Sequence, residues 1–362
     1  MKTKPIRDVA EIRFSGRFDP AQTGFPMMWT GACAEMSVRA SSLEVRIQCD
    51  YQTLKPYLSF EVDGLRAQIF SPVKGTHWYS VLLRMDAATA HRVRITLETQ
   101  AFSADPASYA ALLEVRTDGV FLPLAPLLRK VEFIGDSITS GEGMRGPKGF
   151  MEWVPMCFSA SDSYTRLTAE KLRAQYQVVS QSGWGVVCGW NNDPRTTLPA
   201  VYDQVCGPAA MESPDGTGHG GEKPYRFTFK PDLVVINLGS NDGGALHNPP
   251  FTDPVTGVTH RFTQDDLPRF EAACLAFLLH VGQKNPCANL IWAYGVVGDA
   301  LADPIRRAVT AAQAAGLHAA YLPLPDMHTL RNGVGSREHP GPGAARRMAE
   351  LIVAADKNLR AV

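Results

Sequence analysis

The first third of the chain alternates apolar and polar residues with a period of two. The clearest stretches place apolar side chains at Leu43, Val45 and Ile47, at Leu58, Phe60 and Val62, and at Val93, Ile95 and Leu97. Because successive side chains of a strand point to opposite faces, this spacing predicts short strands with one buried face. Turn-prone clusters such as DPAQTG and VKGTH separate these stretches. We therefore predict an all-β sandwich.

The pattern changes after TDGVFLPLAPLLRK, where Pro123 and Pro126 mark a linker. Beyond the linker, compact apolar runs alternate with segments of helical periodicity. We expect strands near residues 131–135, 176–180, 232–238, 289–295 and 317–322, and helices near 162–175, 265–283, 303–315 and 341–357. This alternation predicts an α/β domain with a parallel sheet covered on both faces. The chain is thus divided into domains of residues 1–125 and 126–362.

Two long segments at residues 207–225 and 243–260 lack the pattern of a helix or a strand. Loops of more than about 15 residues are usually lids, partner surfaces or disordered segments. The second segment directly follows a predicted strand. We expect it to border any active site, because open α/β sheets bind ligands at the carboxyl ends of their strands.

Charge and composition exclude several classes of function. The 36 basic and 36 acidic residues give no net charge, so nothing indicates binding to nucleic acid or to an anionic membrane surface. No apolar run approaches the roughly 20 residues of a membrane span. The first residues lack the apolar region of a secretory signal, so we expect a cytoplasmic protein. The seven cysteines are scattered without a C-x-x-C pair, which favours reduced thiols over disulfides or a zinc site.

The stretch VEFIGDSITSGEGMRG, residues 131–146, is compatible with two chemistries. Gly141, Gly143 and Gly146 match G-x-G-x-x-G, but a dinucleotide loop needs its first glycine directly after the strand and a helix at its last glycine. Here the predicted strand ends near Gly135, and PKGF follows the last glycine. A nucleophilic Ser137 at the end of a buried strand fits the spacing better. The G-x-S-x-G elbow is absent, because position 139 is threonine.

A serine nucleophile needs a base for its proton and fixed donors for the oxyanion. Candidates for both kinds of group lie at the ends of other predicted strands and helices. The strand DLVVINL leads into Asn241, the strand YQVVS leads into Gly183, and His339 lies just before the last predicted helix. The ends of these segments therefore supply the groups that such a serine requires.

These motifs resemble, in order, four blocks of the SGNH (GDSL) hydrolase superfamily. The matching segments are FIGDSIT, SGWG, NLGSND and EHPGPGA, with Ser137, Gly183, Asn241 and His339. The β-rich first half, with VEFIGDSITSGEG and FKPDLVVINLGSND, looks more narrowly like carbohydrate esterase family 2, and that likeness covers nearly the whole chain. The resemblance implies a flavodoxin-like three-layer α/β/α domain after a jelly-roll-like sandwich, and a deacetylase of acetylated xylan or related sugars.

The resemblance and general chemistry together imply a role for each matched residue. Ser137 attacks the ester carbonyl, and His339 accepts the serine proton and returns a proton to the leaving group. The Ser137 and Gly183 N–H groups and the Asn241 amide stabilise the oxyanion. No metal or cofactor is required. The expected partner is an acetylated carbohydrate, and the sequence indicates no oligomeric state.

One position departs from the superfamily pattern. Most members have aspartate three residues before the histidine, where this chain has Ser336. The group that orients His339 could be a backbone carbonyl near Ser336, the carboxylate of Glu338, or a carboxylate distant in sequence. Some members of the resembling esterase family work with a serine–histidine dyad and a carbonyl, which favours the first.

Aromatic residues near the predicted strand ends are candidates for stacking on sugar rings. Trp184, Trp190 and Trp292 lie there, and we select Trp184 and Trp292 as substrate contacts together with Asp136. Core packing for the tryptophans and a brace of the serine turn for Asp136 are the alternatives. The β-sandwich is either a carbohydrate-binding module or a wall of the cleft. An esterase or acyltransferase for non-sugar esters, and a catalytically silent carbohydrate-binding protein, are the rival functions.

Overall fold

The computed structural model of the chain describes residues 1–210 and 219–361. Its residues form two compact units. The first consists of Met1–Pro126 with Asp203–Tyr225, and the second of Leu127–Tyr202 with Arg226–Val362. Part of the predicted long segment 207–225 thus groups with the first unit, and its residues 211–218 lie outside the described residues. The division into domains of residues 1–125 and 126–362 stays a prediction.

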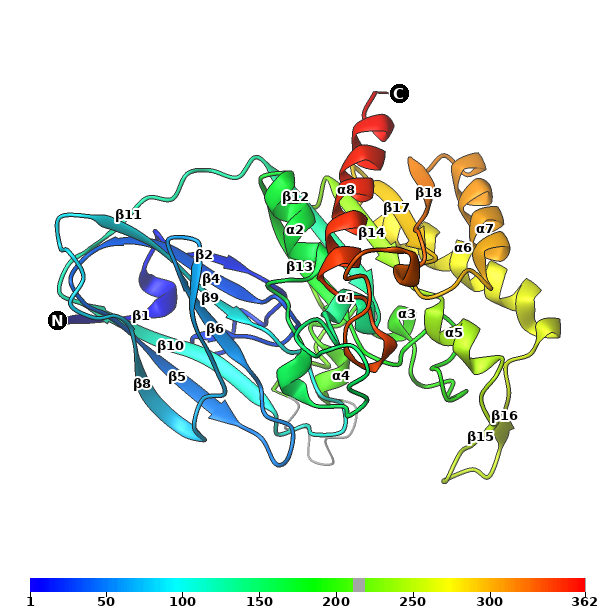
Figure 1. The fold of residues 1–362 in the computed structure, drawn as a ribbon, viewed down its shortest axis with the longest axis horizontal. Helices are drawn as coiled ribbons and strands as arrows, with labels where there is room; N and C mark the ends of the chain where they lie inside the picture. Colours follow the sequence, from blue (N-terminus) through cyan, green and yellow to red (C-terminus); the bar gives the residue numbers. More distant parts are fainter. Residues whose placement is uncertain (211–218, 362) are drawn as a thin grey trace. The chain divides into compact units, whose positions relative to one another are not determined.

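The first unit contains two antiparallel sheets (Figure 1). One has the strand order β1-β10-β5-β8, with β3 paired to β10, and the other has the order β11-β4-β9-β6-β7, with β2 paired to β4. The strands are β1 Lys2–Pro5, β2 Arg13–Ser15, β3 Phe25–Pro26, β4 Cys33–Arg39, β5 Leu43–Asp50, β6 Leu58–Val62, β7 Leu65–Phe70, β8 Gly75–Leu82, β9 Ala90–Leu97, β10 Tyr109–Thr117 and β11 Val120–Leu122. Most of the side chains that alternate in the sequence are buried in one common core.

Contacts within the first unit tie the segment 203–225 to the strands. The Trp29 indole N–H donates to the Val205 carbonyl at 2.6 Å. The rings of Tyr109 and His219 stack with their centroids 3.9 Å apart. These contacts explain why the segment belongs with the β-sheets and not with the part of the chain that surrounds it in sequence.

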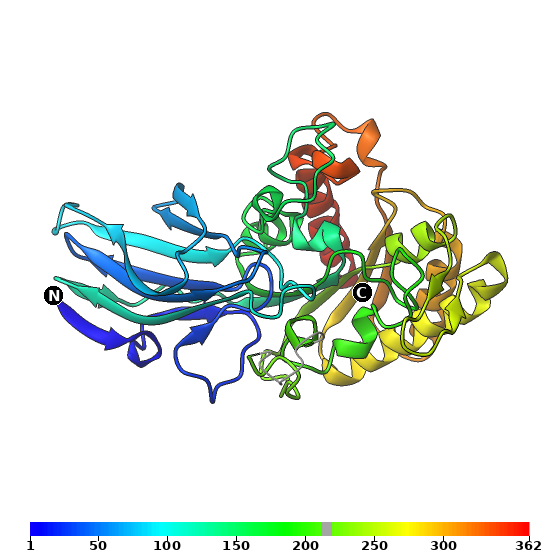
Figure 2. The ribbon, with the colours of Figure 1, turned by 90° about the horizontal axis from the view of Figure 1, so that it is seen from below.

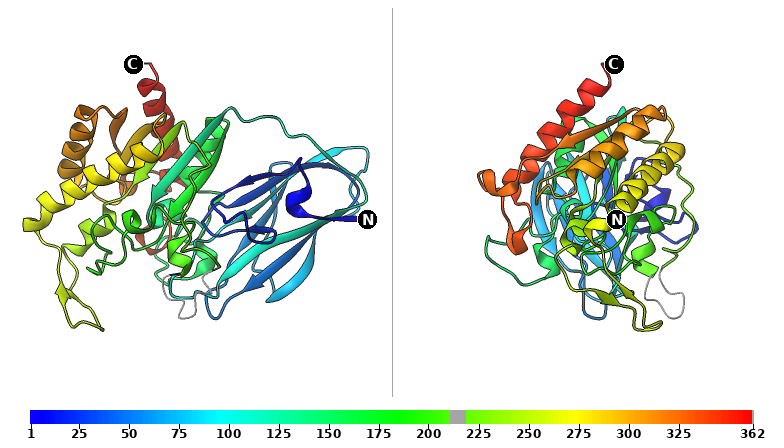
Figure 3. Two further views of the ribbon diagram at one scale, coloured as in Figure 1. Left: turned by 180° about the vertical axis from the view of Figure 1, so that it is seen from behind. Right: turned by 90° about the vertical axis from the view of Figure 1, so that its right-hand side faces the viewer.

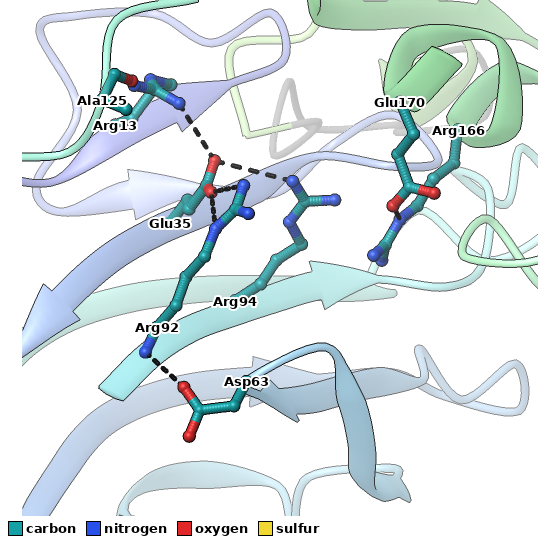
Figure 4. A network of polar contacts seen from close by, with 8 residues as sticks. All are labelled: Arg13, Glu35, Asp63, Arg92, Arg94, Ala125, Arg166 and Glu170. Carbon is teal, nitrogen blue, oxygen red and sulfur yellow. Dashed lines mark hydrogen bonds and ion pairs between the residues drawn. The ribbon is translucent and has the colours of Figure 1, made fainter. Parts of the chain in front are cut away.

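A buried carboxylate joins three strands of the second β-sheet in this unit (Figure 4). Glu35 on β4 lies directly opposite Arg13 on β2 and Arg94 on β9, at 3.3 and 3.6 Å, and Arg92 donates to it at 2.5 Å. Burial alone would raise the pKa of Glu35. The positive charges of the three arginines outweigh burial and lower that pKa. The cluster therefore holds an ionised carboxylate between neighbouring strands.

The second unit is a three-layer α/β/α domain. Its sheet is parallel with the order β13-β12-β14-β17-β18, which is the flavodoxin-like order 2-1-3-4-5. The strands are β12 Arg129–Gly135, β13 Ala174–Ser180, β14 Leu233–Asn237, β17 Asn289–Tyr294 and β18 Ala319–Pro323. A separate hairpin consists of β15 Phe251–Thr252 and β16 Thr259–His260.

Helices cover both faces of this sheet. Figures 2 and 3 show α2 and α8 together on one face and α6 and α7 on the other. The helices are α1 Ser137–Ser140, α2 Tyr164–Lys171, α3 Leu198–Val201, α4 Gly207–Ala210, α5 Ser240–Ala245, α6 Leu267–Lys284, α7 Ala302–Ala314 and α8 Pro342–Leu359, with α4 in the first unit. The predicted fold class is confirmed. The helix predicted to end at residue 175 ends at Lys171, because Arg173 takes a left-handed conformation and β13 begins at Ala174.

Candidate active site

The sheet topology brings the predicted functional residues to one edge. Ser137 begins α1 just after β12, Asn241 lies in α5 just after β14, and Gly183 follows β13. The strands β12, β13 and β14 are neighbours and parallel, so their carboxyl ends share an edge. The order of the sheet reverses around β12, which is where open α/β sheets form their ligand crevice. His339 reaches this edge from the turn before α8.

Ser137 and His339 are in hydrogen-bond contact. The Ser137 Oγ lies 2.9 Å from His339 Nε2. The other ring nitrogen, Nδ1, lies 2.7 Å from the backbone carbonyl oxygen of Arg337. A carbonyl can only accept, so Nδ1 carries the proton and Nε2 of the neutral ring is left to accept from the serine hydroxyl. This geometry suits a serine whose proton is removed by a histidine.

The structure places the other candidates for orienting His339 away from Nδ1. The Glu338 side chain is 51% exposed, and its Oε2 lies 3.6 Å from His328 Nε2. The Ser336 hydroxyl lies 3.5 Å from the Gly143 carbonyl. The group on Nδ1 in this structure is thus the carbonyl two residues before the histidine.

Asp136 is buried beneath Ser137 and does not face a substrate. Its carboxylate caps α1 by accepting from the Ile138 N–H at 3.0 Å, and the Asn241 Nδ2 lies 3.3 Å from it. Burial is the main reason that the pKa of Asp136 rises to about 7, and the charges of Asp242 and Glu142 add to the rise. Asp136 therefore braces the serine turn, which was the alternative to the predicted substrate contact.

Gly183 and Asn241, the two residues predicted to supply oxyanion donors, follow β13 and β14. Gly183 has φ +80°, a left-handed conformation that suits glycine, and its N–H makes no hydrogen bond to any described residue. The Asn241 amide donates to the Trp184 carbonyl at 2.8 Å, and its second contact, to Asp136, is longer at 3.3 Å. One amide hydrogen of Asn241 is thus fixed, and the other has only a long contact.

A second buried acid holds the loop that follows Gly183. Asp242 accepts from the N–H groups of Val186, Val187 and Cys188 at 2.8 to 3.3 Å. Burial raises its pKa to about 6, and these hydrogen bonds oppose the rise. A Cβ at Gly185 would lie 2.4 Å from Asp242 Oδ2, so only glycine fits between the loop and this carboxylate. The loop position is therefore set by direct backbone contacts.

The two tryptophans selected from the sequence lie in the interior. Trp292 is fully buried, and its indole N–H donates to the Leu238 carbonyl at 3.0 Å. Trp184 is also buried. Because their faces are covered, neither ring can stack on a sugar in this conformation. The third tryptophan, Trp190, is 53% exposed. It lies beside Gly183, because a Cβ added at Gly183 would be 3.0 Å from Trp190 Cδ1.

Sequence analysis missed two charged residues at this edge. Glu142 is buried, and its carboxylate contacts the guanidinium of Arg337 and lies 3.8 Å from His339 Nε2. Glu142 lies between two glycines of the glycine pattern, and Arg337 lies just before the EHPGPGA segment, so neither was a candidate. An acid five residues after a nucleophile, with an arginine two residues before the histidine, is the signal that could have found them.

The described residues lack two other kinds of feature. No helix in residues 1–210 or 219–361 is long and apolar enough to cross a membrane. The same residues contain no group of three or more histidine, cysteine or acidic side chains placed to hold a metal ion.

Comparison with known proteins places this site in a family. The GDSL-like lipase/acylhydrolase profile matches residues 131–352. An acetyl xylan esterase, Est2A, from Butyrivibrio proteoclasticus is 32% identical with a TM-score of 0.94, and each chain is covered completely. A family two carbohydrate esterase from Clostridium thermocellum, solved with cellohexaose, is 24% identical with a TM-score of 0.80, and 97% of this chain and 99% of that chain are covered.

A curated relative extends the comparison to a longer protein. The cellulase/esterase CelE of Acetivibrio thermocellus is 28% identical over 246 residues, which cover 66% of this chain but only 27% of CelE. The chain therefore matches about a quarter of that relative's length. The chain belongs to the GDSL-like lipase/acylhydrolase family, and the resemblance to carbohydrate esterase family 2 is confirmed.

Proposed function

We propose that the chain is a serine esterase that removes acetyl groups from carbohydrates such as acetylated xylan or xylo-oligosaccharides. The contact between Ser137 Oγ and His339 Nε2, at 2.9 Å with Nδ1 on a carbonyl, carries the proposal. Among the relatives, an acetyl xylan esterase over its full length and a cellulase/esterase support a carbohydrate ester as the substrate.

The first half of the reaction forms an acyl-enzyme. Ser137 Oγ attacks the acetyl carbonyl while its proton moves to His339 Nε2. The carbonyl oxygen becomes an oxyanion, which accepts from the Gly183 N–H and from the amide hydrogen of Asn241 that turns away from Asp136. The contact of that amide hydrogen with Asp136 is long, at 3.3 Å, so little hydrogen bonding is lost when it turns to the oxyanion. The C–O bond then breaks, and His339 gives its proton to the sugar oxygen.

The second half releases acetate. Water attacks the acetyl carbon of the Ser137 ester, and His339 Nε2 accepts one proton from that water. The tetrahedral intermediate collapses, Ser137 Oγ leaves, and His339 returns the proton to it. The products are acetic acid, which loses a proton to solvent and becomes acetate, and the regenerated Ser137 hydroxyl. The base is used twice, so its ring orientation matters in both halves.

The proposal is tested with acetylated xylo-oligosaccharides and a fluorophosphonate probe. We expect release of acetate, and we expect mass spectrometry of the labelled protein to find the probe on Ser137. A protein that neither releases acetate nor reacts with the probe would be a silent carbohydrate-binding protein. A strong preference for acyl chains of eight or more carbons over acetyl sugar esters would contradict the proposed substrate class.

Replacing Asn241 with alanine should lower kcat for acetyl ester hydrolysis by on the order of 10²-fold or more and change KM little, because an oxyanion donor acts mainly in the transition state. Asn241→Asp is the matched variant of the same shape. It should lose at least as much activity, since a carboxylate repels the oxyanion. Steady-state kinetics of both variants check this, and an alanine variant within threefold of the wild-type kcat would contradict the role.

Trp190 is the exposed aromatic side chain beside Gly183, and we expect it to contact the sugar. Trp190→Ala should raise KM for acetylated xylo-oligosaccharides by about tenfold, the equivalent of about 1.4 kcal/mol. The kcat for p-nitrophenyl acetate should stay within about twofold of wild type, because that ester lacks a sugar. Trp190→Phe keeps a flat ring and serves as the control. Equal loss on both substrates would indicate a disturbed oxyanion loop instead of a lost sugar contact.

A further inference from the structure

The carbonyl that contacts His339 belongs to a residue with a strained backbone. Arg337 has φ 54° and ψ 37°, and Glu338 follows it with φ 51°. Two consecutive residues with a Cβ are therefore left-handed, a conformation that persists only where the surroundings hold it in place. The direction of the Arg337 carbonyl, and with it the orientation of His339, depends on whatever holds this turn.

Backbone hydrogen bonds hold one side of the turn. The Arg337 N–H donates to the Phe150 carbonyl at 2.8 Å, and the Ser336 N–H donates to the Gly143 carbonyl at 3.1 Å. These bonds join the turn to the segment that follows α1. They fix the N–H groups of residues 336 and 337 but leave the side chain of Arg337 as a separate anchor.

The anchor of the Arg337 side chain is Glu142. The guanidinium Nη1 contacts Glu142 Oε1, and the side chains are 34% and 4% exposed respectively. A buried carboxylate is stable only when it is paired, so Glu142 holds the guanidinium firmly. Glu142 follows α1, the helix that begins with Ser137. The ion pair thus ties the turn that orients the base to the segment that carries the nucleophile.

The same carboxylate oxygen also faces the reacting nitrogen. Glu142 Oε1 lies 3.8 Å from His339 Nε2, which is too long for a hydrogen bond but close enough for a charge interaction. When Nε2 takes the serine proton the ring becomes positive, and the Glu142 carboxylate then faces a positively charged ring. Arg337 contacts the same oxygen, so Glu142 Oε1 faces both the anchor of the turn and the reacting nitrogen.

We propose that Glu142 is a positioning residue that replaces the missing acid of the superfamily pattern, by anchoring Arg337 and by placing its charge near His339. This inference rests on the proposed esterase function. It assigns to Glu142 the work that an aspartate at position 336 would do on the other ring nitrogen. Glu338, which the sequence suggested for that work, keeps its carboxylate on His328.

The test compares Glu142→Gln with Glu338→Gln, which both replace a carboxylate with an amide of the same shape. Glu142 is close to His339 in space, and Glu338 is next to it in sequence. Glu142→Gln should lower kcat for an acetyl ester by about 10- to 100-fold with KM within about twofold, as positioning partners commonly do. The rate at which a fluorophosphonate labels Ser137 should fall in parallel. Glu338→Gln should stay within about twofold of wild type in all three measurements.

Two further variants separate positioning from folding. Asp356→Asn breaks another buried ion pair, with Arg129 at 2.7 Å, and should lower the melting temperature while leaving kcat unchanged. Arg337→Gln should reproduce the loss of Glu142→Gln, and the double variant should be no worse than the worse single one. If Glu142→Gln does not fold, Arg337→Gln decides in its place.

The outcomes distinguish this inference from the function on which it rests. A wild type that releases acetate, with Glu142→Gln and Arg337→Gln both within twofold of it, overturns the positioning role alone. A loss in Glu338→Gln equal to that in Glu142→Gln overturns it too. A wild type that neither hydrolyses acetyl esters nor reacts with the probe overturns the esterase proposal itself.

Discussion

Ser137→Ala is expected to lower kcat for acetyl ester hydrolysis by on the order of 10⁴-fold or more, because without the hydroxyl no acyl-enzyme can form. The Oγ donates to His339 Nε2 at 2.9 Å. Alanine removes only the hydroxyl oxygen of Ser137, so we expect little change in the free energy of unfolding. The measurement is steady-state release of p-nitrophenol or acetate, with the melting temperature determined on the same preparations.

Ser140→Ala is the matched control within the same short helix. Ser140 is buried, and its hydroxyl donates to the Ser180 hydroxyl at 2.9 Å, away from His339. Losing a buried hydrogen bond typically costs about 1 kcal/mol of unfolding free energy. Ser140→Ala should therefore lower the melting temperature and keep kcat within a few-fold of wild type. A Ser137→Ala protein with a tenth or more of wild-type activity would eliminate Ser137 as the nucleophile.

Much of the architecture could be predicted because local pattern and burial agree. The alternation at Leu43, Val45 and Ile47 corresponds to β5, whose inward side chains are buried. The apolar runs of the second half correspond to the five parallel strands, because strands covered on both faces need apolar side chains on both. The part of segment 203–225 that joins the β-sheets could not be predicted, since its contacts, such as Trp29 with Val205, link residues distant in sequence.

For the site, the positions of the residues at the sheet edge could be predicted, but the directions of the side chains could not. Ser137, Gly183 and Asn241 follow predicted strands, and parallel strands bring their carboxyl ends to one edge whatever the loops do. Which way a side chain points after the strand end is set by tertiary packing. That is why Trp184 and Trp292, chosen for their positions near strand ends, are buried while another tryptophan is exposed.

The electrostatics of this edge could be predicted only in part, because a brace of the serine turn was one of two interpretations of Asp136. Asp136 and Asp242 are completely buried, and burial raises the pKa of each, to about 7 and about 6. Asp136 accepts from the Ile138 N–H, and Asp242 accepts from the N–H groups of the loop that follows Gly183. Glu142 differs because a guanidinium balances its charge. A single sequence shows only that acids are present, and their roles depend on which N–H groups or cations the fold brings to them.

His339→Ala should lower kcat to a similar extent as Ser137→Ala, on the order of 10⁴-fold, because no base then removes the serine proton. Residues that act as one unit are not additive, so the double variant should be no slower than either single variant. Kinetics of the two single variants and the double variant check this in one series.

The matched control is His328→Ala, which removes a histidine that lies 3.6 Å from Glu338 and contacts neither Ser137 nor His339 among the described contacts. It should keep kcat within about twofold of wild type. His339 has one ring nitrogen on a carbonyl and the other on a serine hydroxyl. Because that arrangement fixes which nitrogen can accept a proton, a His339→Ala protein that retained a tenth of wild-type activity would mean that the serine is activated by another group.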